Sequence, residues 1–218
     1  MSPRRCDPRV ESSIATWTEL VRAVDLRRPL KYSSKAMTRS KSQARFNGRV
    51  QLYTGDGKGK TSAALGLVFR AAGRGLRSFV GQFCKGRTTG ETAAAKMLAS
   101  CIVIRRFGGT GFLRAGTPPS AADRNRARRG IAVCRRAMLS GLYRIVVLDE
   151  ITLALYFKLL AAAEVRAFLD ARPAGVEIVM TGRKAPAWLA GRADLITEMK
   201  ERKHYYAAGL RARRGIED

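Results

Sequence analysis

The segment YTGDGKGKTS, residues 53–62, combines the residue types that bind a chain of phosphates. Alternating glycines let the backbone turn tightly, so that several N–H groups can converge on a phosphate with no Cβ atoms in the way. Lys60 then brings a positive charge to the phosphates, and Thr61 offers a hydroxyl to Mg²⁺. A helix that begins near Ser62 would direct the positive end of its dipole at the same anion. The segment therefore predicts a nucleotide site made of Gly55, Asp56, Gly57, Lys58, Gly59, Lys60, Thr61 and Ser62.

The spacing of this loop departs from the common phosphate-binding motif. The pattern G-x-x-x-x-G-K-[ST] places glycine at position 54, where this chain has Thr54, and the nearest glycine is Gly55. The hydrophobic run before the loop and the helical pattern after it favour a nucleotide site over an exposed glycine-rich turn. Lys58 is either a second phosphate contact or a solvated loop residue.

A second candidate feature is the acidic end of the segment YRIVVLDE, residues 143–150. Asp149 and Glu150 follow an apolar run, and ligands of open α/β sheets bind beyond the carboxyl ends of the strands. Carboxylates at this position help to hold the metal ion on the phosphates. We therefore predict a metal site formed by Thr61, Glu150 and Asp149, with a surface acidic pair as the alternative.

The elements that would position these residues are short apolar strands alternating with helices, which is typical of βαβ units. The predicted strands are 50–53, 78–84, 101–107, 143–149, 176–181 and 194–200, apolar enough to be buried on both faces. The predicted helices are 62–74, 90–99, a segment from Ser120 to about Leu139 that opens with a Ser120–Asp123 capping box, and 164–171. The fold class is α/β: a mainly parallel sheet of about six strands with helices on both faces, a P-loop NTPase-like (RecA-like) three-layer sandwich.

Composition limits the class of protein. The chain has 218 residues and a formal net charge of +25, which attracts phosphates, nucleic acid or anionic membrane surfaces without distinguishing them. No apolar run reaches the roughly 20 residues that a membrane-spanning helix needs. Cys6, Cys84, Cys101 and Cys134 have no metal-binding spacing, so we expect reduced thiols and a reducing compartment.

The first part of the chain differs from the rest. Residues 1–45 lack sustained periodicity, and we expect them to form a basic arm, partly disordered or dependent on a partner, before a single domain over residues 46–218. Its charge and serine content would suit an organelle transit peptide, but four acidic residues dilute that signal. We therefore expect a cytoplasmic protein, or an organelle matrix protein if the arm is a transit peptide.

Several motifs together resemble one family. In order, they are GDGKGKTSAALGLVFRAAGRG, QFCKG, GTGF, IVVLDEITLAL, MTGR, ADLITEMKERKH and GLRARRGIED. They are similar to those of the P-loop class of ATP:corrinoid adenosyltransferases, and the resemblance covers residues 49–218. It implies transfer of the 5′-deoxyadenosyl group of ATP to Co(I) of a reduced corrinoid, cobalamin or cobyrinic acid a,c-diamide, with release of intact triphosphate in cobalamin biosynthesis or salvage.

The resemblance also assigns roles to residues. Lys60, Lys58 and Thr61 would act in catalysis without a protein nucleophile, and Thr61, Glu150 and Asp149 would hold Mg²⁺ or Mn²⁺. A homodimer is implied, and a flavin-dependent reductase is compatible as the electron donor. The +25 charge notwithstanding, we do not expect nucleic acid as a partner.

Four further residues are assigned by motif. Lys85 in QFCKG and Arg183 in MTGR are either substrate contacts or solvated loop cations. Phe112 in GTGFLR is either a corrinoid contact or a core aromatic. Arg114 stands where the family often has tryptophan, and the resemblance makes it a candidate contact to the amide or phosphate groups of the corrinoid. For His204, the only histidine, a packing or hydrogen-bonding role is favoured over a catalytic one.

Two other functions fit parts of the sequence. A nucleic-acid-associated P-loop ATPase is favoured by the charge, and a small-molecule kinase is favoured by the loop alone. Neither accounts for the later motifs. The products separate the three: triphosphate with an adenosylated corrinoid, ADP with phosphate, or ADP with a phosphorylated acceptor.

Overall fold

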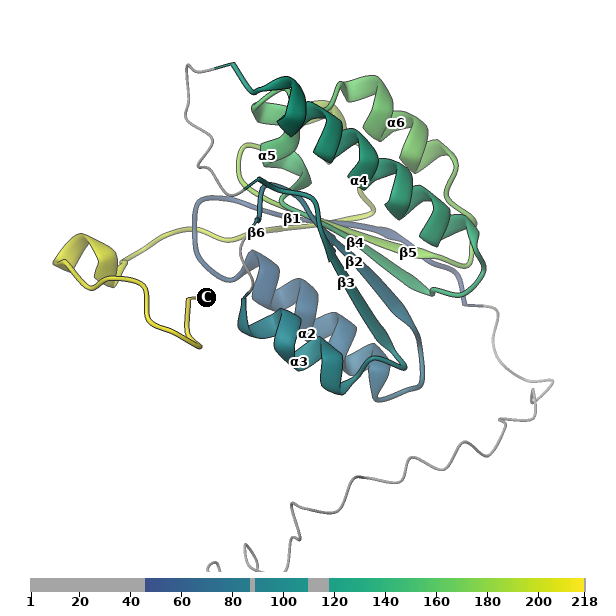
Figure 1. The fold of residues 1–218 in the computed structure, drawn as a ribbon, viewed down its shortest axis with the longest axis horizontal. Helices are drawn as coiled ribbons and strands as arrows, with labels where there is room; N and C mark the ends of the chain where they lie inside the picture. The colour runs from purple at the N-terminus through teal and green to yellow at the C-terminus, as the bar shows by residue number, and fades with distance from the viewer. Residues whose placement is uncertain (1–45, 87–88, 110–117, 218) are drawn as a thin grey trace, which may run out of the picture. The chain divides into compact units, whose positions relative to one another are not determined.

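The computed structural model describes residues 46–86, 89–109 and 118–217, and these contain a six-stranded sheet (Figure 1). Its strands are β1 Val50–Thr54, β2 Ser78–Gln82, β3 Ile102–Arg106, β4 Ile145–Asp149, β5 Glu177–Thr181 and β6 Leu195–Glu198. The spatial order is β3-β2-β4-β5-β1-β6, and every neighbouring pair is parallel. The predicted α/β class is confirmed, and the sheet is wholly parallel.

Helices cover both faces of this sheet, as predicted (Figure 1). One face carries α2 and α3, and the other carries α4, α5 and α6. Their bounds are α2 Lys60–Ala72, α3 Gly90–Met97, α4 Ala121–Leu139, α5 Ile151–Tyr156 and α6 Ala162–Asp170. A short helix α7, Ala187–Ala190, precedes β6, and a 3₁₀ helix η1, Tyr205–Ala208, follows it.

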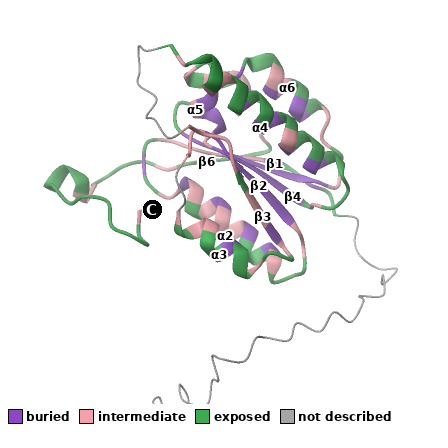
Figure 2. Ribbon diagram, viewed as in Figure 1, coloured by how far each residue is buried: buried purple, intermediate pink, exposed green. Residues whose placement is uncertain are grey.

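Two apolar cores hold the three layers together. Side chains of a strand alternate between the faces of its sheet, so consecutive residues of β4 enter different cores. Val146 and Leu148 pack with α4, α5 and α6, whereas Ile145 and Val147 pack with α2 and α3. Figure 2 shows the result: the central strands are buried, and the outer sides of the helices are exposed.

Most predicted elements match the observed ones within a few residues. The predicted capping box of α4 is present, because the Ser120 hydroxyl accepts the Asp123 N–H at 3.0 Å and the Asp123 carboxylate accepts the Ser120 N–H at 3.3 Å. The helix after the glycine loop begins at Lys60 rather than at Ser62. The three short helices α5, α7 and η1 were not predicted.

The prediction that all strands are buried on both faces is wrong for β3 and β6, the two edge strands of the sheet in the described part of the chain. In β3 only Ile102 is buried and Arg105 is exposed, and all four residues of β6 are exposed. Among the described residues, no helix is both long enough and apolar enough to cross a membrane. The arm 1–45 lies outside the described residues, so its boundary with the domain 46–218 stays a prediction.

Candidate active site at the carboxyl ends of the strands

The glycine loop, residues 55–62, follows β1, includes the first residues of α2, and is pressed against the chain beyond β6. The Gly57 N–H donates to the Met199 carbonyl at 2.7 Å. A Cβ atom on Gly57 would lie 2.8 Å from that same oxygen, and one on Gly55, where φ is +93°, would also clash with the Met199 backbone. These two glycines are therefore required by a close approach of backbone. Phosphate binding, the reason predicted from the sequence, is therefore not the only one for these glycines.

Lys60 lies inside the loop with its charge facing neutral oxygens. Its side chain is 6% exposed, and its ammonium donates to the carbonyls of Gly55 at 2.7 Å and Gly57 at 2.6 Å. Burial, followed by the positive charge of Arg183, lowers the pKa of Lys60. An ammonium that is desolvated and held by carbonyls rather than by a carboxylate is well prepared to bind an incoming anion.

Asp149 lies at the end of β4 and accepts hydrogen bonds from four side chains. It is 1% exposed. Its Oδ1 accepts from the hydroxyls of Thr61 at 2.8 Å and Thr181 at 2.7 Å. Its Oδ2 accepts from Lys85 Nζ at 2.9 Å and from Gln82 Nε2 at 3.2 Å. Asp149 thus connects the glycine loop to the ends of β2 and β5.

Glu150, the next residue, has the features of a cation ligand. Its φ is +62°, a left-handed conformation that costs a non-glycine residue about 1–3 kcal/mol, and its N–H donates to the Thr181 hydroxyl at 2.9 Å. Burial, and then the charge of Asp149, raise the pKa of its carboxyl group. Its Oε2 is buried and has no hydrogen-bond partner among the described residues. A buried, unpartnered carboxylate oxygen suits a hard cation such as Mg²⁺.

A cavity of about 550 Å³ opens between these elements. It is lined by residues 57–62, 65, 90 and 215–217, together with Lys85, Glu91, Glu150, Arg183 and His204. Lys85 and Arg183 thus line the same cavity as the loop, and their contact with substrate stays a prediction. Asp56 is exposed and does not line this cavity, and Phe112 and Arg114 lie outside the described residues.

Comparison with known proteins identifies the family. A protein-family model described as "ATP:corrinoid adenosyltransferase BtuR/CobO/CobP" matches residues 46–217. The chain belongs to this family.

Individual members of the family agree with that match over most of their length. A corrinoid adenosyltransferase of Pseudomonas aeruginosa is 36% identical over 171 residues, which cover 78% of this chain and 83% of the relative. One from a Sinorhizobium species is 32% identical over 206 residues, covering 88% and 92% of the two chains. One from Salmonella typhimurium is 34% identical over 170 residues, covering 78% and 85%.

In this adenosyltransferase, several residues at the site were not predicted from the sequence. They are Gln82, Thr181, Glu91 and Glu217. Thr181 ends a predicted strand, and the ends of parallel strands meet at one edge of a sheet, so its position could have been found. His204 accepts the Tyr206 N–H at 3.1 Å through Nδ1, in keeping with the hydrogen-bonding role that was favoured.

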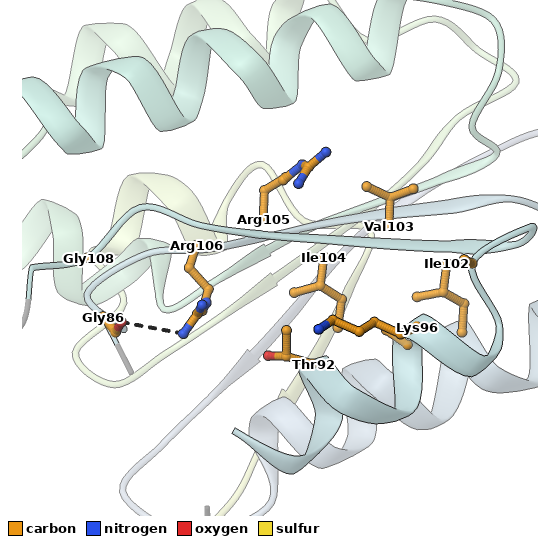
Figure 3. Close-up of a pocket in the computed structure, with 11 residues that line it drawn as sticks. Gly86, Thr92, Lys96, Ile102, Val103, Ile104, Arg105, Arg106 and Gly108 are labelled. Atoms are coloured by element: carbon orange, nitrogen blue, oxygen red, sulfur yellow. Dashed lines mark hydrogen bonds between the residues drawn. The ribbon is translucent and has the colours of Figure 1, made fainter. Parts of the chain in front are cut away.

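A second cavity, of about 590 Å³, lies between α3 and the edge strand β3 (Figure 3). Lys96 and Thr92 reach it from α3, and the guanidinium of Arg106 donates to the Gly86 carbonyl at 3.4 Å. Helix α3 lines both cavities, through Gly90 and Glu91 at the glycine loop and through Thr92, Ala95 and Lys96 here.

Proposed function

We propose that this family member transfers the 5′-deoxyadenosyl group of ATP to the Co(I) centre of a reduced corrinoid, with residues 55–62 as the triphosphate site. The observation that carries the proposal is the convergence of Lys58, Lys60, Lys85 and Arg183 on one cavity at the carboxyl ends of the strands. A triphosphate carries several negative charges, and this cavity offers cations on several sides. The family match over residues 46–217 supports the corrinoid as the acceptor.

The reaction breaks the bond between the 5′ carbon and its oxygen and forms a cobalt–carbon bond with the electron pair of Co(I). Negative charge develops on the departing oxygen of the triphosphate. Lys60 stabilises it after exchanging two carbonyl oxygens for phosphate oxygens. Preorganised donors of this kind each contribute on the order of 3 kcal/mol to lowering a barrier, about a hundredfold in rate. No protein nucleophile is needed.

Mg²⁺ or Mn²⁺ fits the residues present. Mg²⁺ is commonly held by one or two protein oxygens together with waters and phosphates. Glu150 supplies an unpartnered carboxylate oxygen, and Asp149 fixes the hydroxyl of Thr61 at the same edge of the sheet. Within the described ranges, no three acidic, cysteine or histidine side chains group into a metal site, so the nucleotide would complete the coordination. When bound, the metal would neutralise charge on the phosphates.

The finer features of this proposal come from the family resemblance. Both complete cobalamin and cobyrinic acid a,c-diamide are acceptors to be tested. A homodimer, a flavin-dependent reductase as the electron donor, and a cytoplasmic location belong to the same proposal. The arm 1–45 would then precede the catalytic domain.

One experiment tests the function directly. The purified protein is incubated anaerobically with ATP, Mg²⁺ and a panel of chemically reduced corrinoids. We expect the absorption spectrum of a new cobalt–carbon bond and an equal amount of triphosphate. Formation of ADP and phosphate with every corrinoid would instead support a nucleic-acid-associated ATPase or a kinase, and nucleic acid or candidate acceptors would then be added to separate those two.

A further inference from the structure

Four side chains around the proposed metal site form a closed ring of contacts. They are Gln82 at the end of β2, Lys85 three residues later, Glu91 in the first turn of α3, and Asp149 at the end of β4. Gln82 Nε2 donates to Glu91 Oε1 at 3.1 Å and to Asp149 Oδ2 at 3.2 Å. Lys85 Nζ lies 2.9 Å from Asp149 Oδ2 and 3.9 Å from Glu91 Oε1. We call these four residues the acid ring.

The amide of Gln82 is oriented at a cost to stability. Gln82 is fully buried, and its Oε1 has no hydrogen-bond partner among the described residues. A buried acceptor left unsatisfied destabilises the folded protein. The orientation is maintained because both N–H groups of the amide then reach carboxylates, Asp149 on one side and Glu91 on the other. A neutral donor between two acids reduces their repulsion without adding a charge.

Lys85 is held differently from Lys60. Its ammonium hydrogen-bonds Asp149 and also donates to the Thr61 hydroxyl at 3.2 Å, while its charge is shared with Glu91. An ammonium has three N–H groups, so most of its capacity is directed at protein oxygens. Among the described residues, Lys60 donates to carbonyls of the loop and to no carboxylate. Lys85 is therefore placed to fix Asp149 and Thr61, and its charge also adds to the positive field of the cavity.

We propose that Glu91 is a positioning residue for adenosyl transfer: through Gln82 and Lys85 it fixes Asp149, and through Asp149 the hydroxyl of Thr61 that would bind the metal. This inference rests on the proposed function. Glu91 is the one member of the acid ring that comes from α3, so it also holds the start of that helix at the site. It acts on the metal through other residues and is not assigned a contact with the substrate.

The first test replaces Glu91 by Gln and compares it with a matched control, Glu164→Gln. Glu164 also lies in the first turn of a helix and is paired with a cation, Arg128, at 3.4 Å. We expect E91Q to lower kcat about tenfold and to raise the Mg²⁺ concentration for half-maximal rate about tenfold, as removal of groups that orient metal ligands usually does. The KM for ATP at saturating Mg²⁺ changes less than about twofold, since the phosphate-binding loop is intact. E164Q leaves all three quantities unchanged.

The second test exchanges the charges within the acid ring. Gln82→Glu alone puts a third carboxylate between Asp149 and Glu91 and removes the donor they share, and we expect about a hundredfold loss of activity. Adding Glu91→Gln restores the original count of charges, so the double variant regains about tenfold over Q82E. Neighbours in one network give such non-additive effects, whereas residues that only fill space give losses that multiply. Circular dichroism and the melting temperature confirm that each variant is folded.

Calorimetric binding of ATP with and without Mg²⁺ separates failure of this inference from failure of the proposed function. If the wild-type protein adenosylates no corrinoid, the proposed function is wrong. The role of Glu91 in the acid ring is then tested by ATP binding alone. E91Q is then expected to weaken the Mg²⁺-dependent part of ATP binding about tenfold, with Mg²⁺-free binding unchanged. Equal Mg²⁺ dependence in E91Q and E164Q, or multiplicative losses in the double variant, would overturn the positioning role.

Discussion

Two carboxylates contact the glycine loop from different parts of the molecule. Asp149 ends a central strand, is 1% exposed, and binds the loop through the Thr61 hydroxyl. Glu217 lies in the C-terminal segment and binds the loop through Lys58, with 3.7 Å between Nζ and Oε1. Each accepts several hydrogen bonds: Glu217 receives them from the Tyr205 hydroxyl and from the backbone and guanidinium of Arg213.

Asp149 and Glu217 differ in the surroundings of the groups that donate to them. The donors to Asp149 come from β2, α2, β5 and the loop after β2, so the core fixes them before a ligand arrives. The side chains of Lys58 and Arg213 are 46% and 47% exposed, and water can replace Glu217 at either. Ion pairs between exposed groups contribute little to stability, whereas removing one partner of a buried pair is costly. Asp149 therefore organises the site, and Glu217 is suited to be exchanged for a phosphate.

The largest effect is expected when Asp149 is replaced by Ala. Lys85, Gln82 and two threonine hydroxyls would lose their common acceptor, leaving a partly buried ammonium without its closest counter-charge. We expect the free energy of unfolding in urea to fall by about 3–5 kcal/mol and adenosyl transfer to be lost. For Asp149→Asn, which keeps one acceptor oxygen, the free energy of unfolding and the rate of transfer should both lie between those of D149A and the wild type. A wild-type free energy of unfolding for D149A would contradict the role of Asp149 as organiser.

Lys60→Ala is expected to affect activity far more than stability. The variant should lose about a hundredfold or more in the rate of transfer, because one preorganised donor to the leaving triphosphate is gone. Its free energy of unfolding should stay within about 1 kcal/mol, since burial already disfavours the charged form and the partners are neutral carbonyls. Single-turnover rates with pre-reduced corrinoid measure the first quantity, and urea unfolding the second. Near-normal turnover would refute the assignment of the loop.

Glu150→Gln should separate function from stability. Burial raises the pKa of Glu150 above its ordinary 4.5, so its carboxylate destabilises the folded protein at neutral pH and this effect disappears below pH 4.5. We therefore expect the variant to melt at a higher temperature than wild type at pH 7, with the difference shrinking toward pH 4.5. Its Mg²⁺-dependent transfer should fall at least tenfold. A lower melting temperature at pH 7 would show that Glu150 is a stabilising residue rather than a ligand.

The sequence predicted the parts of the site that follow from local rules. A buried strand, a glycine loop and a helix place Lys60 and Thr61, and the end of another apolar strand places Glu150 beside them, because parallel strands end at one edge. Gln82 could not be assigned in this way, since it reads as an interior residue of a strand, and its role depends on carboxylates from two other elements.

The path of the chain beyond β6 also escaped prediction. Glu217 meets Lys58 across more than 150 residues of sequence, and nothing in GLRARRGIED specifies that return. The same path brings Met199 against Gly57, a reason for glycine that no motif states. Exposure of β6 depends on its place at the edge of the sheet, which apolar patterning does not reveal.

The smallest effect is expected for Glu217→Gln. Hydrogen bonds from Arg213 and Tyr205 lower the pKa of Glu217 to about 2, so its contribution is present above its ordinary pKa of 4.5 and is lost only as the pH falls toward 2. Between pH 5 and pH 8 the variant should change the melting temperature by less than about 2 °C. Amide hydrogen exchange in residues 204–217 should nevertheless become faster than in wild type, and the wild-type protection should fall at high salt.

Triphosphate binding completes this comparison. Because Lys58 no longer has to leave a carboxylate, E217Q should bind inorganic triphosphate at least as tightly as wild type, and within about threefold of it. Conversely, adding triphosphate to the wild-type protein should speed amide exchange in residues 204–217. If E217Q instead unfolded as readily as D149A, the number of hydrogen bonds to a carboxylate, and not the burial of its partners, would decide how strongly it holds this loop.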